Sequence, residues 1–210
     1  LAQSSFTVVK QRYVSLLDTW LVSIRVPQGL NSIQAMKASL PEHLQTQLGR
    51  NHIYLTQVGP SSDTMNSEQK KLSSVAQVCN QPSRIGMLDS AIEIHHPLLT
   101  RFSITQQSLL DKSLPISQAH GTAVAGILQH HISSGSQVFN AAVFYSRTQV
   151  SQGASLFDLI SGLDWLSKQQ VSIINMSLTG PQNPLLAQAI TRLSKSGITL
   201  VAAVGNAGPA

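Results

Sequence analysis

Three polar residues beside apolar segments could together carry out acyl transfer. Asp89 directly follows the apolar run 84–88, His120 begins a stretch of small and apolar residues, and Asn206 comes shortly after the apolar run 198–204. Histidine suits the role of general base because its ordinary pKa is about 6.5. A buried carboxylate needs a partner and can orient an imidazole, while a side-chain amide can donate to an oxyanion. Acyl transfer to a hydroxyl also needs the nucleophile itself, which these residues do not supply.

Apolar strands and amphipathic helices alternate in the part of the chain that must position these residues. Strands are predicted at 84–88, 138–145, 171–176 and 198–204, and helices at 119–129, 156–169 and 185–196. This order predicts an α/β fold, with a parallel sheet flanked by helices on both faces. Functional groups of such sheets gather at the carboxyl ends of the strands, where Asp89, Ser177 and Asn206 are expected. Gly197 is expected to end the last helix in a left-handed conformation.

The N-terminal part predicts a small α+β unit over residues 1–58. Its expected elements are a strand or helix at 5–17, a strand at 20–26, a helix opened by Ser32 and a strand at 51–58. Residues 59–83 are predicted to be a linker and lead-in, because turn-forming residues crowd its first part and a short helix fits 70–78. The third segment, 84–210, holds the three candidate catalytic residues.

The composition is that of a globular protein, with 210 residues of which 42% are hydrophobic and 11% charged. No apolar run is long enough to cross a bilayer, so no membrane span is expected. The net charge of +5 is scattered without a basic stripe, so no nucleic-acid partner is expected. The single cysteine, Cys79, cannot form an intrachain disulfide and is expected to be a packing residue or an unpaired thiol.

Two histidine pairs, at 95–96 and 130–131, do not predict a metal site. Adjacent residues on a strand or helix point in different directions, and no cysteine or carboxylate set accompanies them at ligand spacing. The nine acidic residues do not form the oxygen-rich loop that calcium prefers. A nucleotide-binding domain is also disfavoured, because no glycine-rich phosphate loop follows the first strand.

Four short segments carry a family resemblance. They are Met87–Ala91 (MLDSA), His120–Gly126 (HGTAVAG), Ile174–Leu178 (INMSL) and Ala202–Gly208 (AAVGNAG). In this order they resemble the aspartate motif, the histidine motif, the substrate-pairing strand and the oxyanion-asparagine segment of subtilisin-like serine proteases (subtilases, peptidase family S8). The resemblance covers residues 84–210. The order of Asp before His, 31 residues apart, also matches the subtilisin arrangement.

The resemblance implies a serine endopeptidase that acts on peptide or protein substrates and is secreted or periplasmic. Asp89 would orient the imidazole, His120 would act as general base and then general acid, and Asn206 would donate to the oxyanion. The substrate cleft would have two walls, formed by Ser177, Leu178 and Thr179 on one side and by Ala203, Val204 and Gly205 at the S1 pocket on the other. The first wall would bind the peptide backbone as an added strand. Calcium is common in the family but is left unassigned in this sequence, so no cofactor is expected.

The N-terminal part fits a second feature of the family. Subtilases are commonly made with a small α/β prodomain that assists folding and blocks the cleft with its C-terminal tail. Residues 20–58 would be such a domain, and residues 52–57 would be its inhibitory tail. The alternative is a permanent accessory domain.

Two departures from the family pattern bear on activity. Ala91 stands where the aspartate motif usually has glycine, which narrows the allowed backbone angles without predicting inactivity. No Gly-Thr-Ser nucleophile segment occurs up to Ala210. The C-terminal part of the catalytic domain is therefore expected as a second chain or in a longer polypeptide, and this chain alone is expected to be inactive. The alternative is a non-catalytic, subtilase-like peptide-binding module (a pseudoenzyme).

Overall fold

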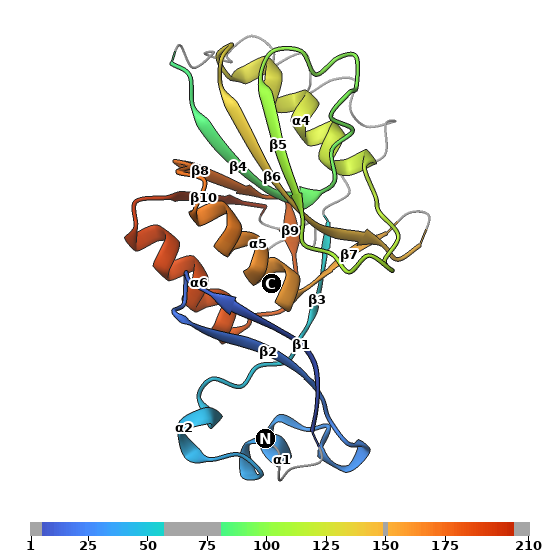
Figure 1. Cartoon of the computed structure of the whole chain (residues 1–210), viewed down its shortest axis with the longest axis vertical. Helices are drawn as coiled ribbons and strands as arrows, with labels where there is room; N and C mark the ends of the chain where they lie inside the picture. The colour runs from blue at the N-terminus through green and yellow to red at the C-terminus, as the bar shows by residue number, and fades with distance from the viewer. Residues whose placement is uncertain (1–5, 57–80, 149–150, 204–210) are drawn as a thin grey trace.

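The described part of the chain, residues 6–56, 81–148 and 151–203 of a computed structural model, is built around one eight-stranded sheet. The strand order is β10-β8-β4-β6-β7-β3-β9, with β5 beside β6 (Figure 1). The strands are β3 (Ile53–Thr56), β4 (Arg84–Ser90), β5 (Ser103–Ser108), β6 (Gln137–Ser146), β7 (Gln152–Ser155), β8 (Ile173–Met176), β9 (Leu178–Thr179) and β10 (Thr199–Ala202). A strand of the N-terminal segment, β3, thus belongs to the same sheet as the predicted catalytic segment.

The sheet is mixed, which corrects the prediction of a purely parallel sheet. Strands β10, β8, β4, β6 and β5 pair in parallel, as the alternating strands and helices predicted. Strands β7, β3 and β9 pair antiparallel. The short connection after β6 allows only an antiparallel return into β7, because a parallel return needs a long crossover. The antiparallel position of β3 is decided by a segment that is distant in the sequence.

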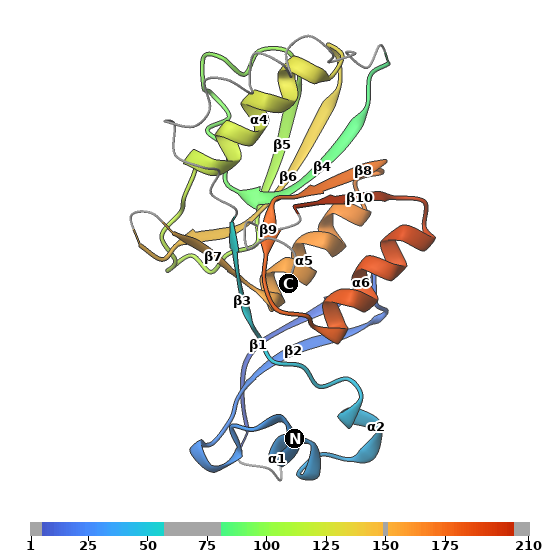
Figure 2. The same ribbon diagram turned by 180° about the vertical axis from the view of Figure 1, so that it is seen from behind.

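Helices cover both faces of the sheet. Helix α4 (Ala119–His131) lies on one side, and α5 (Leu156–Ser167) and α6 (Pro184–Lys195) lie on the other (Figures 1 and 2). Neighbouring residues of β4 point to opposite sides, since Met87 joins the apolar cluster of α4 and Leu88 joins that of α5. The predicted coverage of both faces is confirmed.

The helix boundaries follow local sequence signals. The Ser155 side chain caps α5 by accepting a hydrogen bond from the Asp158 N–H (3.2 Å). Asn183 caps α6 in the same way through the Leu185 N–H (3.0 Å). Gly197 has a φ of +86°, so the predicted left-handed end of α6 is confirmed.

The N-terminal segment contains a hairpin and two short helices. Its elements are β1 (Thr7–Val14), β2 (Thr19–Arg25), the 3-10 helix η1 (Gln28–Leu30), α1 (Ile33–Ala38) and α2 (Glu42–Gln45). The open choice between strand and helix at 5–17 is thus decided in favour of a strand, which pairs antiparallel with β2. The predicted helix at 70–78 and most of the predicted linker lie outside the described residues.

The hairpin is attached to α5 through a buried carboxylate. Asp164 Oδ1 accepts hydrogen bonds from the Ser15 hydroxyl (2.9 Å) and the Leu16 N–H (2.7 Å), and its Oδ2 accepts one from Lys168 (2.7 Å). Burial by itself would raise the pKa of Asp164, but the hydrogen bonds that it accepts, above all the one from Lys168, hold it below the usual aspartate value. The ionised carboxylate therefore stabilises this junction.

Replacing Asp164 by Ala should lower the free energy of unfolding at neutral pH by about 2 kcal/mol, the scale of hydrogen bonds to a charged group. Because the pKa is lowered in the folded state, this stabilisation is present above the ordinary aspartate pKa of about 3.9 and is lost as the pH falls through the folded-state pKa. Urea unfolding at a series of pH values checks it. Lys168→Ala is the control, and it should cost less than about 1 kcal/mol because that side chain is half exposed. A difference between wild type and Asp164→Ala that does not shrink in acid would contradict the prediction.

Candidate active site

Asp89 lies buried near the end of β4, with 1% of its side chain exposed. The pairing of β4 with β6 slips by one residue at this point, since Asp89 pairs with Ala142 and Ser90 with Phe144. Such irregularities re-aim side chains beside active sites. Asp89 Oδ1 accepts a hydrogen bond from the Ser90 N–H at 2.7 Å, which holds the carboxylate in place.

His120 lies in the first turn of α4 and meets Asp89 directly. Its Nδ1 is 2.7 Å from Asp89 Oδ1, and 17% of its side chain is exposed. A carboxylate at this distance favours the neutral imidazole tautomer that carries its proton on Nδ1. In that tautomer Nε2 is the basic nitrogen, so the pair can serve general base chemistry. The two residues that the sequence analysis combined, 31 positions apart, are thus brought together.

Gly121 allows α4 to approach the backbone that follows Asp89. Its N–H donates to Ser90 Oγ at 2.8 Å. A Cβ at position 121 would lie 2.5 Å from Ser90 O and 2.7 Å from Ala91 O, both backbone atoms. Ala91 itself needs no glycine conformation, because the non-glycine residues with positive φ in the described ranges are Asp18 and Gln170. The departure of Ala91 from the family motif is therefore accommodated.

Replacing Gly121 by Ala should destabilise the fold by about 2 kcal/mol, because the added Cβ forces α4 away from the backbone after Asp89. The matched control is Gly126→Ala on the same helix, where nothing lies within 4 Å of an added Cβ. That variant should stabilise the fold by about 1 kcal/mol through helix propensity. Urea unfolding of the two variants measures both effects. Equal effects in the two variants would contradict the close-approach argument.

The predicted substrate wall carries a strand of the N-terminal segment. Ser177 links β8 to β9, and β9 pairs antiparallel with β3 through Leu55 opposite Thr179 and Thr56 opposite Leu178. The predicted inhibitory tail, 52–57, therefore lies against the predicted wall over its described residues. An extended strand on this edge has the pairing expected of a bound peptide.

A second strand, β7, flanks β3 on its other edge and was missed by the sequence analysis. Tyr54 pairs with Ala154, and Leu55 pairs with Gly153. The segment 151–155 is polar and small, so it has no apolar alternation that would indicate a strand. The one signal that the sequence offered was Gly153, and the structure shows why glycine suits this position. A Cβ there would lie 2.5 Å from the Arg147 side chain and 2.8 Å from that of Ile53.

Tyr54 is the most deeply buried residue of β3. It is 2% exposed, and its hydroxyl donates to Pro181 O at 2.9 Å. A Cβ at Gly180 would lie 2.2 Å from the Tyr54 ring, so the glycine lets the ring lie flat against the backbone. Burial raises the pKa of the Tyr54 phenol. Just before β3, Asn51 Oδ1 accepts a hydrogen bond from the Phe157 N–H (3.0 Å) in the first turn of α5.

One pocket joins the two predicted walls of the cleft. It has a volume of about 760 Å³ and is lined by Leu178 and Thr179 from β9 and by Ala203 after β10. Ala203 is thus brought to the same pocket as the first wall. The remaining predicted residues, Asn206, Val204 and Gly205, lie outside the described residues.

The comparison with known families decides the identity of the larger segment. The family described as "Subtilase family" matches residues 81–210, more than half of the chain. The chain belongs to the subtilase family. The family assignment made from the four motifs is confirmed, and the subtilase-like α/β fold accords with the mixed sheet and its helices.

Several subtilases resemble this chain over the same region. Subtilisin DY of Bacillus licheniformis is 28% identical over 130 residues, which are 60% of this chain and 47% of that protein. The minor extracellular protease Epr of Bacillus subtilis (strain 168) is 32% identical over 130 residues, 60% of this chain and 20% of that protein. The major intracellular serine protease of the same strain is 31% identical over 138 residues, 60% of this chain and 43% of that protein. The chain thus spans less than half the length of each of these relatives.

Among solved structures, the prenylagaramide maturation protease PagA matches 68% of this chain and 52% of its own. The sequence identity is 20% and the TM-score is 0.45.

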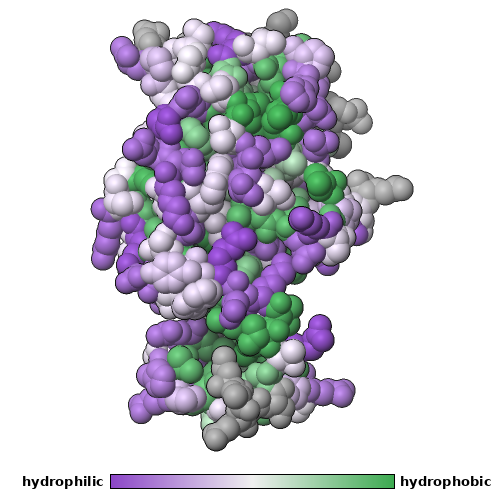
Figure 3. All heavy atoms as spheres, viewed as in Figure 1, coloured by the Kyte–Doolittle hydropathy of each residue, from purple (hydrophilic) through white to green (hydrophobic). Residues whose placement is uncertain are grey.

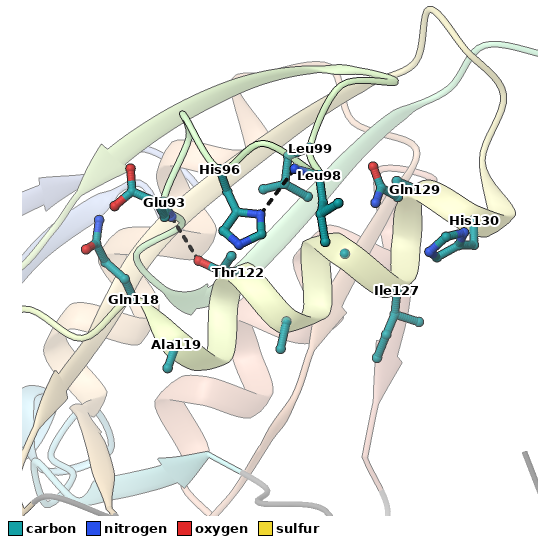
Figure 4. Close-up of a pocket in the computed structure, with 12 residues that line it drawn as sticks. Glu93, His96, Leu98, Leu99, Gln118, Ala119, Thr122, Ile127, Gln129 and His130 are labelled. Atoms are coloured by element: carbon teal, nitrogen blue, oxygen red, sulfur yellow. Dashed lines mark hydrogen bonds between the residues drawn. The ribbon is translucent and has the colours of Figure 1, made fainter.

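A separate apolar groove runs along the outer side of α4 in this subtilase segment. It has a volume of about 620 Å³, and the exposed side chains of Leu98 and Ile127 line it (Figure 4). The apolar surface over α4 is also visible in Figure 3. The loop beside the groove is tied to α4 by the hydrogen bond from the Glu93 N–H to Thr122 Oγ1 (2.9 Å). His96 and His130 also line it, but in the described ranges no three His, Cys, Asp or Glu side chains gather as metal ligands.

None of the helices in the described part of the chain has the length and apolar character needed to cross a bilayer.

Proposed function

We propose that this subtilase segment supplies the general base and the orienting carboxylate of a serine endopeptidase. The observation that carries the proposal is the 2.7 Å contact between His120 Nδ1 and Asp89 Oδ1, with Asp89 buried near the end of a parallel strand. Because a buried carboxylate needs hydrogen-bonding partners, the contact gives Oδ1 of Asp89 a partner and at the same time orients the imidazole.

In the proposed mechanism, His120 takes the proton of a serine hydroxyl as that oxygen attacks the peptide carbonyl. Asn206 donates a hydrogen bond to the resulting oxyanion, and Asp89 stabilises the imidazolium. When the C–N bond breaks, His120 gives the proton to the leaving amine. Water then attacks the acyl-enzyme by the same route and regenerates the serine. The nucleophilic serine would come from the C-terminal part of the catalytic domain, either in a longer polypeptide or as a second chain.

The substrate is proposed to bind as an added strand along β9. The pairing of β3 with β9 and β7 supports this, because it has the antiparallel hydrogen-bonding pattern that an extended peptide would use. The pocket lined by Leu178, Thr179 and Ala203 would then take a substrate side chain. Val204 and Gly205 are proposed to complete its second wall.

Residues 1–58 are proposed to be a prodomain-like segment that blocks this cleft, residues 59–83 its linker, and residues 84–210 the front of the catalytic domain. Three contacts support this. The strand β3 occupies the position where substrate would pair, and the hairpin is held on α5 by Asp164. A second anchor is Lys10, whose Nζ lies 3.6 Å from the carboxylate of Asp158. A permanent accessory domain is the alternative.

A fluorophosphonate probe, which reacts with activated serines, tests the proposed function. A polypeptide that contains residues 1–210 and extends past them should be labelled on one serine, as read by intact mass spectrometry after release of the N-terminal segment. The 210-residue chain alone should stay unlabelled, and His120→Ala should prevent labelling of the longer protein. Peptide binding without labelling would instead favour the non-catalytic, peptide-binding module.

Location is a separate expectation. The relatives named above include one extracellular and one intracellular protease. The secreted or periplasmic location therefore stays a prediction, and detection of the protein in culture medium or periplasm would test it.

A further inference from the structure

Two amides lie in the sheet beside Asp89, and one of them is at a fully buried position where an apolar side chain would be expected. Asn140 is fully buried in the middle of β6, in register with Met87 of β4 and Gln106 of β5. Burying a side-chain amide destabilises a fold unless the amide is hydrogen-bonded. Asn140 Nδ2 donates to Ser90 O (2.9 Å) and to Gln106 Oε1 (2.7 Å). Its Oδ1 is buried and accepts no hydrogen bond in the described ranges. A buried acceptor without a partner lowers the free energy of unfolding, so the hydrogen bonds that Asn140 donates come with a loss of stability.

The two amides form hydrogen bonds with the backbone on both sides of Ala91. Asn140 holds the carbonyl of Ser90, and Gln106 Oε1 accepts a hydrogen bond from the Ile92 N–H at 2.6 Å. The Ile92 N–H can only donate, so it fixes which end of the Gln106 amide faces it. That orientation in turn requires Asn140 to present its NH₂ group to Gln106. The arrangement of both amides is therefore determined by the backbone that they hold.

The backbone segment 90–92, which the two amides bind, connects Asp89 to the helix of His120. Ser90 O, which Asn140 holds, is the atom nearest to the missing Cβ of Gly121, at 2.5 Å. Ser90 Oγ accepts the Gly121 N–H at 2.8 Å, and the Ser90 N–H donates to Asp89 Oδ1 at 2.7 Å. A shift of Ser90 would therefore displace both the N–H that binds the Asp89 carboxylate and Gly121, which follows His120 in the chain.

We propose that Asn140 and Gln106 are positioning residues for the Asp89–His120 pair. They touch neither reacting atom, and they act through Ser90 and Ile92. The register shift between β4 and β6 after Asp89 explains why side chains are needed to hold this backbone. The bulge interrupts the regular pairing of the two strands there, and Ser90 O accepts its hydrogen bond from the Asn140 side chain. The proposal deepens the proposed peptidase function and rests on it.

The test uses the imidazole tautomer of His120, which a merely structural role would not change. Nitrogen chemical shifts of ¹⁵N-histidine-labelled protein are recorded at about pH 9, where imidazoles are neutral. The signal of His120 among the seven histidines is assigned by its loss in His120→Ala. Wild type should show the proton on Nδ1. In Asn140→Leu and Gln106→Leu, the ratio of the Nδ1–H to the Nε2–H form should fall roughly tenfold.

Two control variants separate positioning from packing. Gln106→Glu keeps an acceptor for the Ile92 N–H and should retain the wild-type ratio, since Gln106 is only half buried. Val138→Ala removes a buried side chain from the same strand, two positions before Asn140, and should lower the melting temperature without changing the ratio.

The outcomes distinguish the two proposals. An unchanged ratio in Asn140→Leu and Gln106→Leu, or an equal fall in Val138→Ala, overturns the positioning role while the peptidase function stands. If His120 of the wild-type protein lacks the Nδ1–H form, it cannot act as the proposed general base. Both the peptidase proposal and the positioning role would then be wrong.

Discussion

Replacing Asp89 by Asn in a polypeptide that supplies the serine should lower both kcat and the rate of fluorophosphonate labelling by roughly 10⁴-fold. The Ser90 N–H and His120 Nδ1 both contact Oδ1 of Asp89, whereas Oδ2 has no hydrogen-bond partner among the described residues. The amide oxygen of asparagine can keep the Ser90 N–H, so the local backbone should hold. A neutral amide, however, neither fixes the Nδ1–H tautomer of His120 as a carboxylate does nor stabilises the imidazolium that forms when the serine proton is taken. Hydrolysis of a fluorogenic peptide and the time course of labelling measure the effect.

The matched control for this variant is Asp111→Asn. Asp111 is an exposed carboxylate that accepts a hydrogen bond from the Ser113 N–H (3.0 Å) and lies outside the site. It should leave kcat and labelling unchanged. Asp89→Asn retaining more than about a tenth of wild-type kcat would exclude an orienting role for Asp89.

Replacing Tyr54 by Ala should lower the free energy of unfolding of the chain by about 3 kcal/mol and release β3 from the cleft. The ring is 2% exposed, and its hydroxyl is bonded to Pro181 O, so truncation removes both packing and a hydrogen bond. Urea unfolding measures the free energy. Limited proteolysis within 53–56 measures release, and it should become at least roughly tenfold faster.

A double-mutant cycle with Gly180 makes this prediction specific to the contact. Gly180→Ala alone should destabilise strongly, because its Cβ would lie 2.2 Å from the Tyr54 ring. In the Tyr54→Ala background the same change should cost less than about 0.5 kcal/mol, since the clashing ring is gone. Leu55→Ala is the control on the same strand, and it should have a small effect because Leu55 is 39% exposed. Additive effects of the two changes would show that Tyr54 and Gly180 do not pack together, and β3 would lose its anchor.

Local signals in the sequence were enough to predict one part of the fold and of the site. The apolar runs and amphipathic spacings predicted the parallel strands β4, β6, β8 and β10 and the helices α4, α5 and α6 close to their observed bounds. The pairing of Asp89 with His120 was also predictable, because the carboxyl end of a parallel strand and the start of a helix meet at the same edge of the sheet. Gly197 marked a helix end because only glycine adopts a φ of +86° without strain.

Other features depend on contacts between segments that are distant in the sequence, and these became visible only in the folded chain. Strand β5 is polar and alternates weakly, so only its pairing with β6 makes it a strand. The insertion of β3 between β9 and β7 rests on hydrogen bonds to segments about a hundred residues later, and sequence periodicity carries no information about such register. Asn140 and Gln106 form their hydrogen bonds with the backbone after Asp89 at the place where the pairing of β4 with β6 shifts by one residue. Hydrogen bonds of this kind exist only when the fold brings both partners together, which is why residue type and spacing did not reveal them.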